Sequence, residues 1–583
     1  MWSYEAPLRD MEFVLEHWLQ APSAWQALDL SLAMQVLEEA ARFSQGVLAP
    51  LNSQGDRQGC RWQAGQVSTP DGFVEAYQAY VDGGWPGLAC AEAVGGQGLP
   101  QLLDAALQEM LYASNHAWAM YTGIAHGAYL CLKTHAEQWL QARYLPEIVS
   151  GQALPTMCLT EPQAGSDVGL LRCRAEPQAD GSYRLSGSKL FISGGEHDLT
   201  ANILHLVLAR LPDAPPGSRG ISLFLVPKRL DDGHVNGVRC DGLEHKMGIK
   251  GSATAQIVLD GAVGTMVGQA NKGMNGMFVM MNAARLGVGN QSLGLTEVAY
   301  QNALAYAKDR IQMRSLSGAK RPDLAADPII VHPDVRKMLL TARAYAEGAR
   351  ALVYFVAVEL DKEHNHPDEA VRKESSDIVA LLTPIVKAFI TDNAWISTVH
   401  CQQVYGGHGF IHEWGMEQFV RDARINMIYE GTNTVQSLDL LGRKVLGDGG
   451  AKLTAFGKKI GRFVKENADN EAMQEFTKPL GELGQKVQAF TMEIGMKGMQ
   501  NPDEVGAAAV DYLRVVGHLV YSYFFAMSAK IALEKQASDD TFYKAKLATA
   551  RFYFTKLAPE VETLMITAKA GLKPLTEMDE ALF

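Results

Sequence analysis

The period of the apolar residues changes twice along the 583-residue chain, and these changes constrain its architecture more than any other feature. Up to about residue 156, apolar residues recur every three or four positions, as they do in amphipathic helices. From Met157 to about residue 270, short apolar or alternating runs are separated by Gly, Pro, Asp and Asn, which is typical of strands and turns. From about Met274 the helical period returns. The sequence therefore predicts a mostly α-helical α+β protein.

This pattern divides the chain into four predicted domains. An N-terminal helical domain, residues 1–156, is expected to contain helices near 29–46, 71–82, 101–113, 117–132 and 136–150. A middle β barrel or sandwich, 157–270, is expected to contain strands at 183–193, 203–211, 220–227 and 256–259. A four-helix bundle, 271–447, is expected to use helices near 275–308, 332–363, 374–405 and 430–446. An additional helical domain, 448–583, follows a glycine-rich linker, with helices at 451–466, 474–499, 503–535 and 538–570.

Composition excludes some functions. A net charge of −12 argues against a general affinity for nucleic acid, because such binding depends on neutralising phosphates. The seven cysteines form no CxxC pair, so we expect reduced thiols and no metal site. The N-terminus shows neither a secretory signal nor a transit peptide, and no run of 18 apolar residues occurs, so a cytoplasmic location is expected.

The predicted helix 451–466 is amphipathic and strongly basic. Leu453, Phe456, Ile460 and Phe463 share one face, while lysines and arginines occupy the others. Such a helix can lie on a membrane surface or dock on a neighbouring domain. Docking on the preceding domain is the favoured interpretation.

One carboxylate stands out near the end of the predicted bundle. Glu430 follows the apolar run Met427–Tyr429 and precedes Gly431, so we expect a helix to stop there. Thr432 and Asn433 are typical N-cap residues for a helix that restarts through Val435. Apolar neighbours tend to raise the pKa of a carboxylate, which suits a general base, although most carboxylates at helix ends have no catalytic role.

A second motif opens the β domain. Thr160-Glu161-Pro162-Gln163-Ala164-Gly165-Ser166-Asp167 combines small hydroxyl residues with glycine on a short loop, and such a loop suits a planar heterocycle rich in hydrogen-bonding atoms. An ordinary turn has the same composition. Together with Ile428-Tyr429-Glu430-Gly431-Thr432 and the order of the domains, however, this motif gives the chain a resemblance to the acyl-CoA dehydrogenase family. The resemblance covers residues 30–446.

The resemblance implies a reaction and a cofactor. Members of this family use FAD to remove hydrogen from the α and β carbons of an acyl-CoA thioester, the first step of fatty-acid β-oxidation, and pass the electrons to an electron-transferring flavoprotein. By position in the motif, Glu430 is the base that removes the α-proton while a hydride leaves Cβ. The resemblance places Gly431, Ser166, Asn282 and Arg285 against the CoA thioester.

The resemblance also implies two sets of FAD contacts. The first set comes from the loops around the flavin ring, with the Ser193 hydroxyl near flavin N5: Leu159, Thr160, Ser166, Phe191, Ile192, Ser193, Thr432 and Thr434. The second set reaches the FAD of a neighbouring subunit: Arg310, Gln403, Gly406 and Gly407. Met313 and Arg314 replace the Phe and Gly usual in the family, and His332 stands where relatives often carry a Gln, so the local packing must differ there.

The sequence also gives expectations for the length of the substrate's acyl chain and for the oligomeric state. A glycine after Thr122, near the expected pocket floor, favours a medium to long acyl chain. A short methylthio-propionyl-type acyl group is the alternative, because a bacterial relative acting on such a thioester shares the long C-terminal extension. Long-chain relatives use this extension to cover a tetramer surface, so a homodimer is expected. Two rival functions are an acyl-CoA oxidase and a flavin-fold stress or DNA-associated protein.

Overall fold

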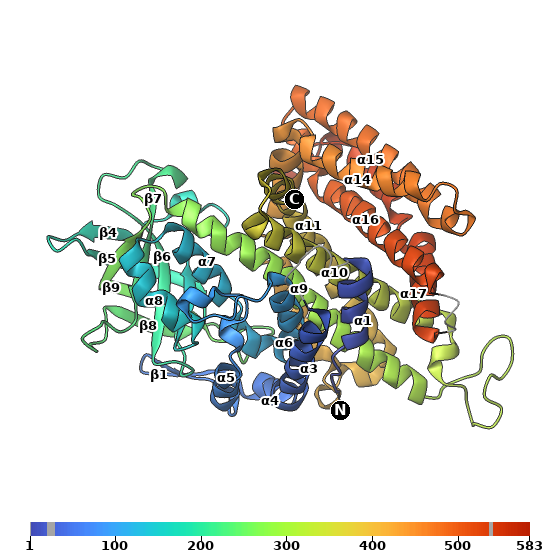
Figure 1. Cartoon of the computed structure of the whole chain (residues 1–583), viewed down its shortest axis with the longest axis horizontal. Helices are drawn as coiled ribbons and strands as arrows, with labels where there is room; N and C mark the ends of the chain where they lie inside the picture. The colour runs from blue at the N-terminus through green and yellow to red at the C-terminus, as the bar shows by residue number, and fades with distance from the viewer. Residues whose placement is uncertain (1, 20–28, 536–539) are drawn as a thin grey trace. The chain divides into compact units, whose positions relative to one another are not determined.

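The computed structural model describes residues 2–19, 29–535 and 540–583. The chain forms two compact units, one of residues 38–287 and one of residues 1–37 together with 288–583. Helices dominate both units, and the large sheet belongs to the first (Figure 1). This matches the predicted fold class, while the four domain boundaries drawn from the sequence stay a prediction.

Most helices of the 38–287 unit follow the predicted apolar stripes. They are α4 Ala49–Gln58, α5 Phe73–Asp82, α6 Gln101–Thr122, α7 Ala125–His135 and α8 Gln138–Val149, and α3 Leu30–Phe43 leads into them. The sequence did not predict α4, and the predicted helix 117–132 is interrupted where α6 ends and α7 begins. The sequence predicted a break between 113 and 117, but α6 continues through this stretch with a kink at Asn115, whose φ and ψ are −156° and 87°. The Asn115 side chain accepts a hydrogen bond from the Trp118 N–H at 3.0 Å, so it caps the second half of the helix.

The middle sheet closes on itself. Its strands are β3 Ala153–Cys158, β4 Arg174–Pro177, β5 Tyr183–Ser193, β6 Asn202–Arg210, β7 Ile221–Pro227, β8 Val238–Leu243 and β9 Thr254–Val267. The order β3-β6-β4-β5-β9-β7 is closed by an additional β6–β7 pairing, which makes a barrel, and β8 pairs with β9. The sequence did not predict β3, β4, β8 or the hairpin of β1 Arg61–Gln63 and β2 Gln66–Ser68.

The core of this unit joins helices to the barrel. Apolar residues of β6 and β7 pack with α7, α8 and the first turns of α9 Gly273–Asp309. All positions of β7 and the central positions of β6 are buried, which explains why both strands appear in the sequence as continuous apolar runs.

The other unit contains the bundle. Helices α10 Pro333–Asn365 and α11 Glu369–Val404 pack along each other, and α9 ends in this unit. The predicted fourth helix, near 430–446, is observed as α13 Asn433–Leu438 followed by a π-helical turn Asp439–Val445. Before it lie α12 Met416–Arg424 and a 3-10 turn Ile425–Met427, which the sequence did not predict. The break between α12 and α13 contains the turn that carries Glu430.

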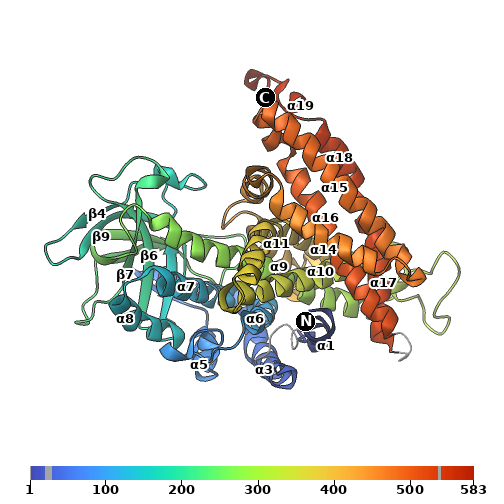
Figure 2. The same ribbon diagram turned by 45° about the horizontal axis from the view of Figure 1, so that its top comes forward.

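The C-terminal helices belong to the same unit. They are α14 Ala451–Glu466, α15 Gln474–Gln500, α16 Asp503–Glu534, α17 Thr541–Phe552, α18 Glu560–Lys569 and the short α19 Lys573–Thr576 (Figure 2). The predicted helix 538–570 is in fact two helices, because α18 restarts after Pro559, and the predicted start at residue 538 lies outside the described residues. Helix α16 packs on α10, α11 and α13.

Helix α14 packs on α11 of the bundle, as the sequence favoured, and also on α15. Its residues Phe456, Ile460 and Phe463 are buried, and the rings of Phe456 and Phe463 contact Tyr523 of α16. On its basic side, Lys459 Nζ lies 2.8 Å from a carboxylate oxygen of Glu374 at the start of α11. By length and composition alone, α11 and α16 are apolar enough to cross a membrane, but 83% and 72% of their apolar windows are buried inside the protein.

Candidate active site

Two segments predicted to face the flavin meet at one edge of the barrel. The Leu190 N–H in β5 donates to the Thr160 carbonyl oxygen at 2.9 Å. One residue earlier in the same strand, Lys189 Nζ donates to Glu161 Oε1 at 2.8 Å and to the Leu159 carbonyl oxygen at 3.1 Å. The predicted flavin loop and the end of β5 are therefore fixed to each other.

Glu161 is the centre of this arrangement, and the sequence analysis did not single it out. Its oxygens also accept from the N–H groups of Arg172 at 2.7 Å and Cys173 at 3.0 Å. Burial alone would raise the pKa of Glu161, but the charge and hydrogen bond of Lys189 and the two N–H donors hold that pKa below its ordinary value. The available signal was Lys189 itself, because this charged residue shares the inward face of β5 with the buried Leu185.

The side chains of these segments suit a planar, hydrogen-bonding ligand. Phe191 is 59% exposed and has φ +60°, so an aromatic ring is held at the surface by a left-handed backbone. Thr160 and Ser193 are half-buried, and Ser166 is exposed. Ile192 is buried, so a contact from this residue to a cofactor would use its backbone.

The two residues predicted to bind CoA lie on α9 in the same unit. Arg285 Nη1 donates to Asn282 Oδ1 at 3.3 Å across one helical turn. Arg285 is buried and Asn282 is exposed. The arginine is thus oriented by a neutral amide of its own helix.

The Glu430 turn lies in the other unit and confirms the predicted helix stop. Glu430 has φ +57° and Gly431 has φ +83°, so two successive residues adopt the left-handed region. Thr432 then caps α13 by accepting from the Val435 N–H at 3.3 Å. A non-glycine residue in this region is strained by roughly 1–3 kcal/mol, and such strain is concentrated at functional sites. Glu430 itself is half-buried.

The residues predicted to reach a neighbouring FAD also meet in this unit. Tyr306, near the end of α9, stacks on Tyr405 with ring centroids 4.1 Å apart and bonds His408 Nδ1 through its hydroxyl at 2.9 Å. This contact brings the end of α9, and with it Arg310, to the turn that holds Gln403, Gly406 and Gly407. Arg310 and Gln403 are both exposed.

The departures from the family motif have a local explanation. Arg314 donates to Asp327 Oδ1 at 3.3 Å and to two carbonyl oxygens of its own loop. Asp327 is fully buried and also accepts from the Ser315 N–H at 3.0 Å. His332 bonds the Gln312 carbonyl oxygen at 3.0 Å. The loop after α9 is therefore stabilised by polar contacts rather than by an aromatic side chain.

Together the donor groups fit FAD. Hydroxyls at Thr160 and Ser193 beside the exposed Phe191 suit the flavin ring, and an exposed arginine beside glycines suits a pyrophosphate, since its guanidinium donates two hydrogen bonds at once. A cluster of three or more His, Cys, Asp or Glu side chains that could hold a metal ion does not occur among the described residues.

Comparison with known families identifies the family of this chain. Residues 33–152, 156–262 and 271–446 match the N-terminal, middle and C-terminal domains of acyl-CoA dehydrogenases, and residues 456–579 match a domain described as acetyl-CoA dehydrogenase C-terminal like. The chain belongs to the acyl-CoA dehydrogenase family. It is therefore an FAD-dependent oxidoreductase.

Two full-length relatives show how the family members differ. The chain is 41% identical to 3-methylmercaptopropionyl-CoA dehydrogenase of Ruegeria pomeroyi, covering 96% of each protein. It is 33% identical to the broad-specificity linear acyl-CoA dehydrogenase FadE5 of Mycobacterium tuberculosis, covering 100% of each. Among solved structures, Caenorhabditis elegans ACDH-11 in complex with C11-CoA has a TM-score of 0.79 at 19% identity, covering 96% of this chain and 92% of that one, which shows the shared fold.

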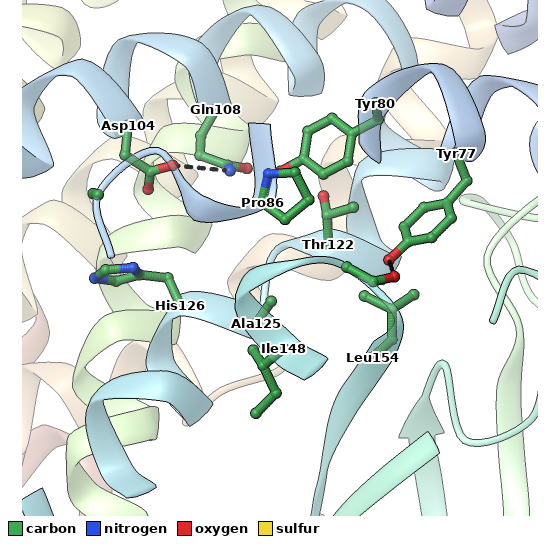
Figure 3. A pocket seen from close by; sticks show the side chains of 12 residues that line it. Tyr77, Tyr80, Pro86, Asp104, Gln108, Thr122, Ala125, His126, Ile148 and Leu154 are labelled. Atoms are coloured by element: carbon green, nitrogen blue, oxygen red, sulfur yellow. Dashed lines mark hydrogen bonds between the residues drawn. The ribbon is translucent and has the colours of Figure 1, made fainter. Parts of the chain in front are cut away.

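Thr122 is the last residue of α6 and lines a small cavity, and Gly123 follows it as the C-cap of the helix. Figure 3 shows Thr122 lining this cavity with Asp104 and His126. At Gly123, an added Cβ would lie 2.5 Å from the Tyr112 hydroxyl oxygen. Because Tyr112 already occupies this space, the glycine does not create the extra depth on which the expectation of a longer acyl chain rested.

Asp104 gives a pH-dependent prediction. Burial raises the pKa of Asp104 to about 6, although the hydrogen bond from Gln108 lowers it in part. The folded protein thus prefers the neutral carboxyl, so Asp104 destabilises the fold progressively as the pH rises from 3.8 to about 6, by up to about 3 kcal/mol in total. We expect Asp104→Asn to unfold at a higher temperature than wild type at about pH 8, and at nearly the same temperature at about pH 4.

The matched control is Asp82→Asn. Asp82 is exposed and also accepts a hydrogen bond from a glutamine four residues away, Gln78. Thermal unfolding of both variants, followed by circular dichroism, checks the prediction. An equal shift for Asp104→Asn at both pH values would contradict it.

Proposed function

We propose that this acyl-CoA dehydrogenase acts on a short acyl-CoA of the methylthio-propionyl type. The observation that carries the proposal is the 41% identity, over 96% of both chains, to a dehydrogenase of 3-methylmercaptopropionyl-CoA. The position of the Tyr112 hydroxyl also supports the proposal of a short acyl group. This hydroxyl occupies the space next to Gly123, so the glycine gives no reason to expect a deeper pocket. A second candidate is a linear acyl-CoA of medium to long chain, as in fatty-acid β-oxidation. It is favoured by the full-length similarity to a broad-specificity linear enzyme.

In this proposal Glu430 is the catalytic base. Its carboxylate takes the proton from the α carbon of the thioester, while the C–H bond at the β carbon breaks with its electron pair. FAD, when bound, supplies the hydride acceptor. The strained turn at Glu430 and Gly431 supports this role, since a fixed carboxylate needs little reorganisation during proton transfer. Thr160, Phe191 and Ser193 would hold the flavin ring, and Arg285 with Asn282 would contact CoA.

Electron transfer and assembly complete the proposal. Electrons would leave to an electron-transferring flavoprotein, which is in keeping with the family. The protein would form a cytoplasmic homodimer, in which Arg310, Gln403, Gly406 and Gly407 of one subunit contact the FAD of the other. The exposure of Arg310 supports this assignment, because an exposed guanidinium can donate hydrogen bonds to a phosphate group of a second molecule.

The deciding experiment compares acyl chains. 3-Methylthiopropionyl-, butyryl-, octanoyl- and palmitoyl-CoA are added anaerobically to purified protein, and the loss of the oxidised flavin absorbance is followed. We expect 3-methylthiopropionyl-CoA to reduce the flavin with the highest kcat/KM. A higher value for octanoyl- or palmitoyl-CoA would favour the second candidate, and no bleaching by any thioester would contradict the proposed activity.

The same sample separates the oxidase alternative. After reduction, either air or an electron-transferring flavoprotein is admitted, and reoxidation is followed together with peroxide. Rapid reoxidation by the flavoprotein with little peroxide supports the dehydrogenase. Rapid peroxide formation during turnover in air would identify an oxidase.

A further inference from the structure

The helix that follows the Glu430 turn is held by polar groups of α11. Asn433, the first residue of α13, accepts from Lys387 Nζ at 2.8 Å through its Oδ1. Its Nδ2 donates to Asp392 Oδ1 at 2.6 Å and to Thr391 Oγ1 at 3.0 Å. Because Asn433 stands three residues after Glu430, these bonds fix the C-terminal end of the strained turn.

The same stretch of α11 is contacted by the C-terminal domain. Both Nη atoms of Arg514, on α16, lie 3.4 Å from Asn393 Oδ1. Nη2 also donates to Glu560 Oε2 of α18 at 2.6 Å, and the guanidinium lies 5.7 Å from the ring centroid of Phe389. The Arg514 side chain is only 13% exposed. A planar guanidinium that is paired, stacked and largely buried holds its position well.

Electrostatic interactions link Arg514 to Asp392. Burial raises the pKa of Asp392, and the hydrogen bond from Asn433 and the positive charges of Arg514 and Lys387 oppose this rise. The net shift of the Asp392 pKa is upward, and the positive charge of Arg514, which contacts the adjacent Asn393, limits this rise. Lys387 is fully buried, so it also depends on a nearby negative charge.

We infer that Arg514 is a positioning residue for Glu430, and that it acts from the C-terminal domain through Asp392 and Asn433. This inference rests on the proposed role of Glu430 as the base. It gives the additional domain a part in the reaction, because α16 also packs directly on α13. A small displacement of a catalytic group is enough to slow a reaction strongly.

The test measures flavin reduction by 3-methylthiopropionyl-CoA and butyryl-CoA in FAD-loaded protein under anaerobic conditions. For Arg514→Met we expect the limiting rate to fall about ten- to a hundredfold while the half-saturating substrate concentration stays nearly constant. Arg514→Lys, which keeps the charge, should recover part of the rate. The matched control is Arg551→Met, because Arg551 pairs with Glu475 in the same domain but is 50% exposed, and this variant should react at the wild-type rate.

A double-mutant cycle tests whether the effect of Arg514 passes through Asp392. If Arg514 acts through Asp392, then Arg514→Met combined with Asp392→Asn should slow the reaction less than the product of the two single effects. If Arg514→Met does not retain FAD, Arg514→Lys replaces it in the cycle. A wild-type rate for a folded Arg514 variant, or fully multiplicative effects, would overturn the inference while the proposed function stands. An unreactive wild type would instead refute the proposed function.

Discussion

Replacing Glu430 by glutamine should leave FAD bound and make the flavin resistant to reduction by acyl-CoA. Glutamine has nearly the same shape, so the turn at Glu430 and Gly431 can keep its backbone conformation, but a neutral amide cannot accept the α-proton. Loss of a general base lowers rates by about 10²- to 10⁴-fold, and here no other group of this turn carries a carboxylate. The measurement is the anaerobic rate of flavin bleaching by 3-methylthiopropionyl-CoA.

The control for this variant is Glu413→Gln. Glu413 is an exposed carboxylate of the same unit, in the short 3-10 turn His412–Trp414. Its substitution should change neither the flavin content nor the bleaching rate. If Glu430→Gln bleaches as fast as this control, the base lies elsewhere in the protein.

The second large effect is expected at Lys189. In Lys189→Met a side chain of similar length replaces the ammonium, so the buried Glu161 loses its ion pair and the Leu159 carbonyl loses a donor. Removing one partner of a buried ion pair destabilises a protein by about 3–5 kcal/mol, because an uncompensated charge stays buried. We expect a lower unfolding temperature and loss of FAD, since the same pair fixes the predicted flavin loop to β5.

Two comparison variants make this prediction specific. Lys486→Met removes an exposed ion pair with Glu562 and should change the stability by less than about 1 kcal/mol. The double variant Glu161→Gln with Lys189→Met removes both buried charges and should be more stable than Lys189→Met alone. Denaturant unfolding and the flavin-to-protein absorbance ratio measure both effects. A Lys189→Met protein as stable and as rich in flavin as wild type would contradict the prediction.

Local patterns in the sequence were sufficient for the succession of a helical region, a β region and further helical regions. The apolar period distinguishes helices from strands because it depends only on neighbours in the chain, and it predicted β5 at 183–193 and α14 at 451–466 with the bounds that the structure shows. Turns and helix caps also depend on residues that are neighbours in the chain, so the helix stop at Glu430 and the cap at Thr432 could be predicted. The motifs at 160–167 and 428–432 carried the family resemblance, and the family comparisons confirmed it.

Other features depend on contacts between distant residues, which no local period records. Glu161 and Lys189 are 28 positions apart, and Arg514 lies 121 positions from Asn393, yet both contacts hold segments of the candidate site. The Tyr112 hydroxyl fills the space at Gly123, so a glycine that suggested depth in the sequence is packed in the fold. The sequence by itself thus determined the succession of helical and β regions, the motifs and the family. Only the tertiary structure decided which charged groups support the site, because burial and pairing arise when separate segments meet.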